Sequence, residues 1–310
     1  MSNTLDWLRS HSIVVADTAV QQDITRYQPI DATTNPSLVY QAVKDPALTK
    51  TVRSVRDALT TGEIKSVSEA AERLAVTLGV AIAGQIPGYI STEVDARLSF
   101  DTAASIAAAH RIMALYADAG VPSERILIKL AATWEGIDAC RELEATGIHC
   151  NLTLVFSEGQ ALAAAHAGAT LISPFVGRIY DWHVARQQVP SDAQHDPGVL
   201  SVRRIYRLYK SHGVKTIIMG ASFRNVGQIL ALAGCDRLTI SPKLLGELEQ
   251  MDRPVQPMVP PEPIQAPLPE LSRSQFLLAL AADPMATEKL SDGITRFIAD
   301  QEALDALLER

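Results

Sequence analysis

Eight short apolar runs, each followed by a longer stretch with helical periodicity, constrain what this chain can fold into. The runs are rich in leucine and β-branched residues, as expected of parallel strands buried on both faces. They occupy residues 12–18, 30–34, 88–94, 126–131, 149–155, 170–176, 215–221 and 237–241. This alternation predicts a closed barrel or a doubly wound sheet.

Helical stripes and glycine stops separate the strands. A stripe at helical spacing begins after Asp196 and ends before Gly213, and a second helix covers about 134–146. The first stripe consists of Val202, Ile205, Tyr206 and Tyr209. A further helix, ended by Gly120, places these residues on one apolar face: Ala103, Ile106, Ala107, Met113, Ala114 and Ala117.

The remaining segments add helices and a strap to one domain that spans residues 1–310. Residues 36–84 carry no strand signal and are predicted to be helical throughout. Residues 252–270 are rich in proline and predict a loop or extended strap over the barrel surface. The tail 272–308 predicts two helices. We therefore expect a single (β/α)₈ barrel with extra N-terminal and C-terminal helices.

Composition narrows the function classes. A chain of 310 residues with a net charge of -7 has no global attraction for nucleic acid or anionic membranes. No apolar run is long enough for a membrane span, and the N-terminus does not resemble a signal peptide. The three scattered cysteines indicate reduced thiols in a cytoplasmic protein. Any anionic substrate must then be bound by local positive groups.

Polar residues fall at the ends of successive predicted strands. Ionisable side chains in apolar strands are costly unless they are paired, whereas the C-terminal mouth of a barrel is where such folds place their sites. The residues concerned are Asp17, Thr33, Thr34, Asn35, Glu93, Lys129, Asn151, Thr153, Ser173, Ser222 and Ser241. Any one of them could face loop solvent, but their convergence from eight strands predicts a common site.

Lys129 is the sharpest single feature, because it lies within the otherwise apolar run ILIKLAAT. A lysine amine is nucleophilic only when neutral, and burial favours the neutral form. A nearby Asp17 or Glu93 would favour the charged form instead. The alternative to a nucleophile is a structural lysine paired with one of those carboxylates.

Two arginines, Arg178 and Arg224, follow the sixth and seventh predicted strands. Loops after the late strands of such barrels often bind phosphate, and guanidinium forks suit phosphate oxygens. Ser222 and the backbone N–H groups of a helix predicted at 223–233 could add donors. Solvated surface arginines are the alternative. Nucleotide-binding, zinc-protease and serine-hydrolase motifs are absent from the sequence, and the seven histidines show no ligand spacing.

At these residues the chain resembles the transaldolase family. The similar stretches are VVADTA (14–19), DATTNPSL (31–38), STEVDARLS (91–99), ILIKLAATWEGI (126–137), GIHCNLTLVFS (147–157), LISPFVGRIYDW (171–182), MGASFRNVGQI (219–229) and AGCDRLTISP (233–242). They span nearly the whole predicted barrel. Tyr89 stands where a basic residue is expected, and the proline-rich stretch and tail are less typical.

The resemblance implies a role for each matching residue. Lys129 matches the Schiff-base lysine, Asp17 the acid/base at the substrate C4 hydroxyl, and Glu93 with Thr153 the pair that handles the catalytic water. The implied dihydroxyacetone pocket consists of Thr33, Asn35, Asn151, Ser173 and Phe175. The implied phosphate site consists of Arg178, Ser222 and Arg224.

The implied reaction is transfer of a three-carbon ketol unit between sugar phosphates in the non-oxidative pentose phosphate pathway. No metal or organic cofactor is implied, and the expected assembly is a cytoplasmic homodimer. Three alternatives remain at this point: a Schiff-base aldolase that releases free dihydroxyacetone, a non-catalytic sugar-phosphate-binding barrel, and a metal-dependent hydrolase. The absence of evident metal ligands makes the last the weakest.

Overall fold

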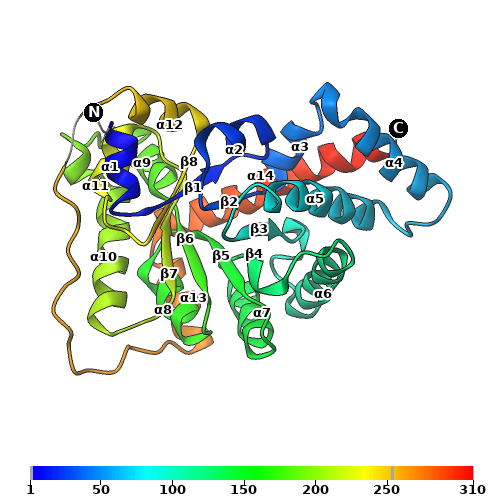
Figure 1. The fold of residues 1–310 in the computed structure, drawn as a ribbon. Coiled ribbons are helices and arrows are strands. Elements are labelled where there is room, and N and C mark those ends of the chain that lie inside the picture. Colours follow the sequence, from blue (N-terminus) through cyan, green and yellow to red (C-terminus); the bar gives the residue numbers. More distant parts are fainter. Residues whose placement is uncertain (1–2, 253–254, 310) are drawn as a thin grey trace.

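A closed barrel of eight parallel strands forms the centre of the protein in a computed structural model that describes residues 3–252 and 255–309 (Figure 1). The strands are β1 (Ile13–Asp17), β2 (Asp31–Thr33), β3 (Ile90–Glu93), β4 (Ile126–Ala131), β5 (Cys150–Val155), β6 (Leu171–Pro174), β7 (Ile217–Gly220) and β8 (Arg237–Ile240). They follow one another around the barrel in chain order, and β8 pairs back onto β1. The predicted (β/α)₈ barrel is confirmed, and this closure rules out the doubly wound sheet.

Helices surround the barrel, and further helices precede the first strand and follow the last one. They are α1 (Thr4–Arg9), α2 (Gln21–Tyr27), α3 (Pro36–Ala42), α4 (Thr49–Thr60), α5 (Val67–Ala83), α6 (Thr102–Asp118), α7 (Trp134–Ala145), α8 (Glu158–His166), α9 (Val176–Val184), α10 (Pro197–Ser211), α11 (Val226–Ala231), α12 (Pro242–Glu249), α13 (Arg273–Ala281) and α14 (Pro284–Leu308). Short 3₁₀ turns are η1 (Pro46–Leu48), η2 (Ala96–Leu98), η3 (Ser123–Arg125) and η4 (Ala193–His195). The segment 36–84 is helical as predicted, although turns divide it into α3, α4 and α5.

The predicted helical stripes have two different outcomes. All four large residues of the α10 stripe are buried, and Asp196 caps the helix by accepting hydrogen bonds from the backbone of Gly198 and Val199. The apolar face predicted for α6 is wrong, because its buried residues are Ser105, Ala108, Ala109, Ile112 and Tyr116. The alanines of α6 lie on all sides of the helix, so small residues alone do not show which face packs against the barrel.

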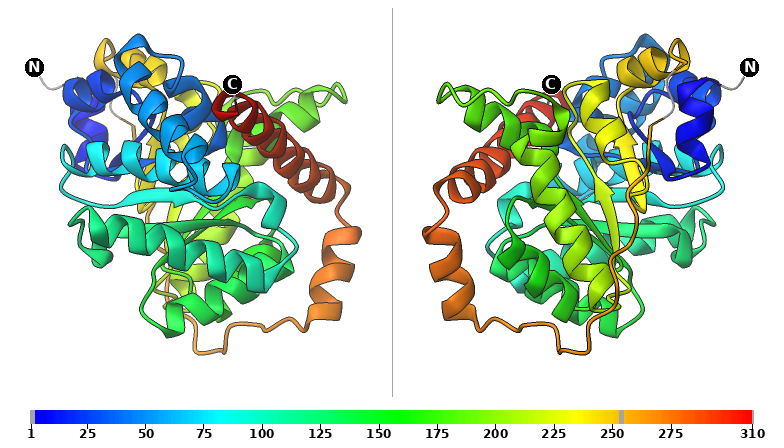
Figure 2. Two further views of the ribbon diagram at one scale, coloured as in Figure 1. Left: turned by 90° about the vertical axis from the view of Figure 1, so that its right-hand side faces the viewer. Right: turned by 90° about the vertical axis from the view of Figure 1, so that its left-hand side faces the viewer.

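The proline-rich stretch is an extended strap, as predicted. Its described residues form neither helix nor strand, and Figure 2 shows them running along the outside of the barrel to α13. The Met258 N–H donates to the Ala233 carbonyl at 2.7 Å, and the Ile264 N–H donates to the Ser211 carbonyl at 2.9 Å. The two helices predicted for the tail are confirmed as α13 and α14.

The N-terminal end of the barrel is closed by a buried ion pair. Asp31 of β2 pairs with Arg237 of β8, and the guanidinium of Arg237 lies 5.1 Å from the ring centre of Tyr89. The Tyr89 N–H also donates to the Asp31 carboxylate at 2.7 Å. Tyr89, which replaces the basic residue expected from the resemblance, therefore belongs to the closed end of the barrel, away from the strand ends that form the site.

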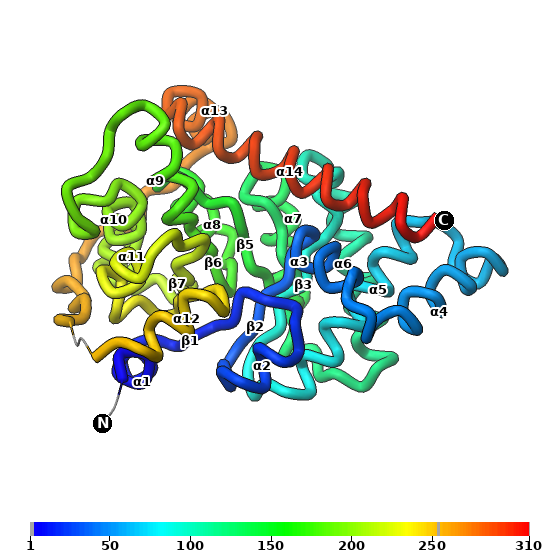
Figure 3. The backbone as a smooth tube through the Cα atoms, turned by 90° about the horizontal axis from the view of Figure 1, so that it is seen from above, coloured from blue at the N-terminus to red at the C-terminus, as the bar shows by residue number. Residues whose placement is uncertain are grey.

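The long helix α14 packs against the C-terminal end of the barrel. Figure 3 shows it running from α13 past α3 toward α4. Its inward side chains form a cluster with the strand ends: Ala96, Ala131, Leu154, Phe156, Phe175, Ile179, Ala221, Ala286, Leu290, Ile294 and Phe297. Leu154 joins this cluster because β5 carries a register shift there, with a left-handed backbone at Leu154 (φ 57°). The irregularity turns an apolar side chain of β5 toward α14.

Candidate active site

A cavity of about 90 Å³ lies at the C-terminal ends of the strands, between the barrel and α14. Its lining residues are Asp17, Thr33, Asn35, Lys129, Thr153, Ser173, Phe175, Arg178, Met219, Ala221, Ser222, Thr239 and Phe297. Most of the residues predicted for the site therefore converge on this cavity. Glu93, Asn151 and Arg224 are not among its lining residues, but each contacts a residue that is.

Lys129 is buried and paired within the site. Its Nζ lies 3.0 Å from Oε2 of Glu93 and donates to the Thr34 carbonyl at 3.2 Å. The two side chains are only 6% and 4% exposed, and the register of β3 on β4 places them directly opposite each other. The ion pair is what a structural lysine would show, but Lys129 also lines the cavity, where its amine can meet a ligand.

Burial raises the pKa of both carboxyl groups beside the lysine. For Asp17, burial is the largest effect, and Lys129, the Thr33 hydroxyl and Arg178 oppose it. For Glu93, burial again raises the pKa, while the charge and hydrogen bond of Lys129 and the charge of Arg178 lower it. Both groups can therefore exchange protons closer to neutral pH than ordinary carboxylates do.

Neutral polar groups line one side of the cavity. Ser173 Oγ donates to Oδ1 of Asn151 at 2.7 Å, and Nδ2 of Asn151 donates to Ser91 Oγ at 3.1 Å. This chain of bonds fixes the orientation of the Asn151 amide. Thr153 Oγ1, by contrast, is buried without a hydrogen-bond partner among the residues that the structure describes. Buried polar atoms are seldom left unpaired, so this hydroxyl is suited to hold water or a ligand.

Arg178 supplies positive charge at the rim of the cavity. Its guanidinium lies 5.0 Å from the ring centre of Phe175 and 5.4 Å from that of Phe297. Burial lowers its pKa, and the nearby Arg296 of α14 lowers it further. Within the described residues, its buried Nη1 has no hydrogen-bond partner. An anion would satisfy both the free donor and the excess positive charge.

The loop after β7 brings Ser222 and Arg224 to the same rim. Ser222 has a left-handed backbone (φ 62°), a strained conformation for a residue with a side chain. A side chain at Gly177 would lie 2.1 Å from the Ser222 carbonyl, so only glycine allows this close approach. Arg224 pairs with Asp181 at 2.7 Å and also donates to Ser222 Oγ at 3.3 Å.

The helix predicted at 223–233 is shorter than expected. It begins at Val226, because Asn225 caps it by accepting from the Gln228 N–H at 3.0 Å. Residues 223–225 therefore belong to the loop, and their N–H groups are not the first turn of a helix. The Arg224 N–H is already used, since it donates to the Gln228 side chain at 2.8 Å.

The sequence analysis missed several residues of the site. The hydroxyl groups of Thr239 and Thr33, on the two strands that flank β1, share a hydrogen bond at 3.2 Å, and Thr239 could have been found as a polar residue within a predicted strand. Phe297 and Arg296 come from α14, more than a hundred residues after Lys129 in the chain. No local pattern indicates that a C-terminal helix returns to the mouth of the barrel.

Two of the three cysteines lie close together in the fold. The thiols of Cys140 and Cys150 and the Glu144 carboxylate lie within 4.8 Å of one another. A hydrogen bond with Cys140 and burial raise the pKa of the Cys150 thiol well above its ordinary value. The Glu144 carboxylate already accepts from the backbone of Cys150 and Thr170, which explains its place there without a metal.

A second and larger cavity, of about 730 Å³, lies between α10, α11 and the strap. The paired amine and carboxylates converge on the smaller cavity, so we place the candidate active site there. No helix within residues 3–252 or 255–309 has both the length and the apolar character needed to cross a bilayer.

The fold and the site together define a (β/α)₈-barrel enzyme that carries a buried amine paired with one carboxyl group and close enough to a second to affect its pKa. The model of the family described as Transaldolase/Fructose-6-phosphate aldolase matches residues 14–308, and the chain belongs to this family. A transaldolase of Alteromonas mediterranea is 53% identical, over 99% of this chain and 98% of its own length. Transaldolases of Shewanella oneidensis and Shewanella pealeana are 51% and 50% identical, each over the whole of this chain and 98% of their own length.

Proposed function

We propose that this chain is a transaldolase that carries a dihydroxyacetone unit on Lys129. The donor would be sedoheptulose 7-phosphate or fructose 6-phosphate, and the acceptor glyceraldehyde 3-phosphate or erythrose 4-phosphate, as in the non-oxidative pentose phosphate pathway. The observation that carries this proposal is the amine of Lys129, buried in the cavity and in contact with Glu93. Relatives called transaldolase that match over their full length support it.

The first step is formation of the imine. Glu93, whose pKa is raised by burial, takes a proton from the Lys129 ammonium, and the neutral amine attacks the C2 carbonyl of the ketose. The resulting carbinolamine loses its oxygen as water. Glu93 returns the proton that this departure needs, and the unpartnered Thr153 hydroxyl holds the departing water. The product is a protonated imine between C2 and Lys129.

Carbon–carbon cleavage follows, with Asp17 as the base. Asp17 takes the proton of the C4 hydroxyl, the C4–O bond becomes the carbonyl of the leaving aldehyde, and the C3–C4 electron pair moves into the imine. Lys129 then holds a neutral enamine. An incoming aldehyde reacts at C3 of the enamine, and Asp17 returns its proton to the new hydroxyl. Hydrolysis of the imine, the reverse of the first step, releases the new ketose.

The surrounding groups fit the two ends of such a substrate. Hydroxyl and amide groups of Thr33, Asn35, Asn151 and Ser173 would hold the dihydroxyacetone unit beside the Phe175 ring. Arg178, with its free Nη1, and Ser222 and Arg224 would bind the phosphate. Tight polar contact with the enamine delays its release, so that an aldehyde can capture it.

Borohydride trapping tests the covalent step. Incubation with fructose 6-phosphate and borohydride should add one reduced dihydroxyacetone unit, and peptide mass spectrometry should locate it on Lys129. The Lys129→Met variant should gain no adduct, whereas Lys50→Met, which removes an exposed lysine of α4, should label like the wild type. An adduct on another lysine, or none on a protein that turns over substrate, would reject the assignment.

A second assay separates the transferase from an aldolase that releases dihydroxyacetone. Fructose 6-phosphate should be consumed rapidly only when an acceptor aldehyde is present. Equal rates with and without the acceptor, together with free dihydroxyacetone in solution, would favour the aldolase.

We also propose that the protein works as a homodimer in the cytoplasm, as the family resemblance implies. Light scattering coupled to size-exclusion chromatography should give twice the chain mass of 33.5 kDa. A monomer mass at micromolar concentration would contradict the proposed assembly.

A further inference from the structure

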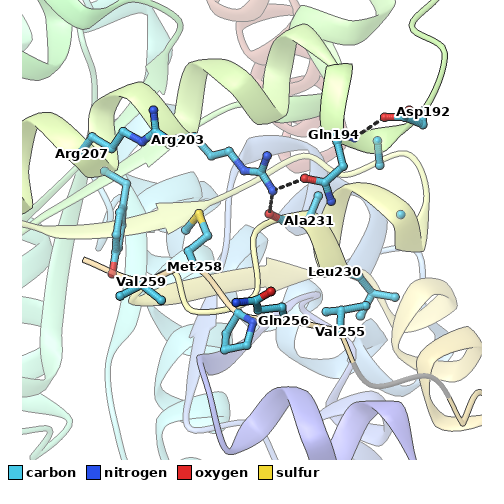
Figure 4. Close-up of a pocket in the computed structure, with 14 residues that line it drawn as sticks. Asp192, Gln194, Arg203, Arg207, Leu230, Ala231, Val255, Gln256, Met258 and Val259 are labelled. Carbon is cyan, nitrogen blue, oxygen red and sulfur yellow. Dashed lines mark hydrogen bonds between the residues drawn. The ribbon is translucent and has the colours of Figure 1, made fainter. Parts of the chain in front are cut away.

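The cavity between α10, α11 and the strap lies outside the candidate active site and has the size of a ligand site. Its volume of about 730 Å³ is within the usual range of roughly 300–1,000 Å³ for small-molecule sites. Figure 4 shows that Arg203 and Arg207 approach it from α10, while Gln256 and Met258 of the strap lie on the opposite side. This cavity shares no lining residue with the candidate active site, so a ligand site here is independent of the proposed function.

The two arginines are left without a counter-charge. Arg203 donates to the Gln194 side chain at 2.6 Å and to the Ala231 carbonyl at 2.7 Å, and both acceptors are neutral. Within the described part of the chain, neither Arg203 nor Arg207 forms an ion pair. Burial lowers the pKa of Arg203, and the charge of Arg207 one turn away lowers it further. Like charges at this spacing destabilise a helix, so an anion between them would relieve a real repulsion.

Neighbouring charges on α10 show that this arrangement is unusual for the helix. Arg204 pairs with Glu158 at 3.0 Å, and Lys210 pairs with Asp236 at 2.7 Å. Among the described lining residues, Asp192 is the one carboxylate, and it already accepts from the backbone of Gln194 and from His195. Among the described residues, the only ion-pair partner of Asp192 is His195, so the charges of Arg203 and Arg207 remain available to a ligand.

The opposite wall is apolar and held in place. Leu230, Val255, Met258 and Val259 line it, and Val259 is 74% exposed. The strap is anchored where the Met258 N–H bonds to Ala233, and a side chain at Gly234 would lie 2.7 Å from the Met258 carbonyl. Gly234 also has a left-handed backbone (φ 93°), which glycine adopts most easily. The chain therefore builds a wall against which the uncharged part of a ligand can pack.

We propose that this cavity binds a small organic phosphate monoester. The phosphate, with up to two negative charges, would lie between Arg203 and Arg207, whose guanidinium groups offer paired donors suited to phosphate oxygens. The organic body would pack on Leu230, Val255 and Met258. An anion without such a body would leave this apolar wall in water, so inorganic phosphate should bind more weakly.

Calorimetric titration with phenyl phosphate tests the site. All proteins carry Arg178→Ala and Arg224→Ala, so that phosphate binding in the candidate active site is weakened as far as its two arginines allow. On this background we expect one saturable site, with weaker binding of inorganic phosphate and no binding of phenol. If phenyl phosphate does not saturate, or binds no better than inorganic phosphate, the proposal fails.

Replacements on α10 locate the site. Arg207→Gln should weaken phenyl phosphate at least about tenfold, and Arg207→Lys, which keeps the charge but loses the fork, should fall in between. Arg204 lies on the same helix but does not line the cavity. Arg204→Gln removes the same charge and should change the affinity less than about twofold. Arg207 is exposed and forms no described hydrogen bond, so its replacement should leave the fold intact, as circular dichroism can check. Equal losses for Arg204→Gln and Arg207→Gln would show only long-range charge and overturn the proposal.

Discussion

At the scale of single residues, Asp17 and Glu93 are kept where a charge is unfavourable. The charges of Lys129 and Arg178 partly offset this cost for both groups, and the Thr33 hydroxyl does so for Asp17. A carboxyl group in such a place holds its proton at a higher pH than usual. This suits acid–base work, in which a group must accept a proton and give it back within one cycle. The same environment lowers the stability of the folded protein at neutral pH.

Asp17→Asn should slow carbon–carbon cleavage by roughly 10²–10⁴-fold. The amide keeps the size and can still form hydrogen bonds, but it cannot take the C4 hydroxyl proton. Imine formation does not need Asp17, so borohydride trapping with fructose 6-phosphate should persist. Near-normal turnover by this variant would move the base to another residue, with Glu93 the next candidate.

Asp17→Asn should also change how stability depends on pH. The folded pKa of Asp17 lies above the usual 3.8, so the folded state holds the proton more tightly than the unfolded chain does. Wild-type stability therefore falls as pH rises from the unfolded to the folded pKa, whereas the amide does not titrate. The variant should gain thermal stability relative to the wild type between acidic and neutral pH, and the gain should vanish below pH 3.8. A constant difference across that range would contradict the raised pKa.

Arg178→Ala should weaken use of phosphorylated donors more than Arg224→Ala does. Arg178 lines the cavity with a free Nη1, whereas Arg224 is already paired with Asp181. The measurement is kcat/KM for fructose 6-phosphate and for unphosphorylated fructose in each variant. For Arg178→Ala we expect a loss of at least about tenfold with fructose 6-phosphate and little change with fructose. Equal losses for both donors would mean that Arg178 supports structure and that the phosphate binds elsewhere.

At the scale of elements, α14 decides how large the candidate site is. A cavity of about 90 Å³ is smaller than the sites that usually hold small ligands, so a sugar phosphate needs Arg178, Phe297 or α14 itself to shift. Gly293 lies where α14 closely approaches Leu154 and Arg178. A Cβ there would meet a Leu154 methyl group at 2.7 Å and Nη1 of Arg178 at 2.9 Å.

Gly293→Ala should therefore lower kcat/KM for fructose 6-phosphate several-fold, because the methyl group displaces Arg178 or lifts α14. Alanine favours helix by about 1 kcal/mol over glycine, so helix propensity alone predicts a gain in stability. Gly159→Ala in α8 is the control, since its Cβ would meet only ordinary contacts at 3.6 Å or more. Both variants can be followed by steady-state kinetics and thermal denaturation. Unchanged kinetics for Gly293→Ala would show that the contact is not part of the site.

The sequence predicted elements best where one residue decides the local structure. Asp196 and Gly213 bound α10, and buried β-branched runs mark the strands, because caps, stops and two-sided burial leave local patterns. The face of α6 and the start of α11 were predicted wrongly, since alanine has no strong facing preference and the Asn225 cap competes with a longer helix. The part played by Phe297 depends on the path of the tail, which no local pattern encodes.

At the scale of the whole molecule, closure of the barrel depends on its N-terminal end as well as on its strands. The Asp31–Arg237 pair joins β2 to β8 across β1, and both side chains are almost completely buried. Breaking a buried ion pair leaves one charge without compensation. The pair lies at the end opposite to the candidate site, so its effect on stability can be measured separately from catalysis.

Arg237→Met should reduce the free energy of unfolding by about 3–5 kcal/mol, because Asp31 is left buried and unpaired. The KM of the remaining folded enzyme should stay close to the wild-type value. Arg204→Met, which breaks the exposed pair with Glu158, should cost no more than about 1 kcal/mol. Urea denaturation measures both. A loss below 1 kcal/mol for Arg237→Met would show that the closed end tolerates an unpaired Asp31.

The position of α14 in the sequence, after all eight strands, also affects the order in which the parts of the site are synthesised. The strands and the residues proposed for catalysis all precede residue 242, whereas the helix that completes the mouth of the barrel ends at Leu308. During translation, the barrel strands can leave the ribosome while the 25 residues of α14 are still in the exit tunnel. Until α14 has also emerged, the amine and carboxyl groups lie in an open barrel, and the site becomes enclosed only when α14 packs against the strand ends.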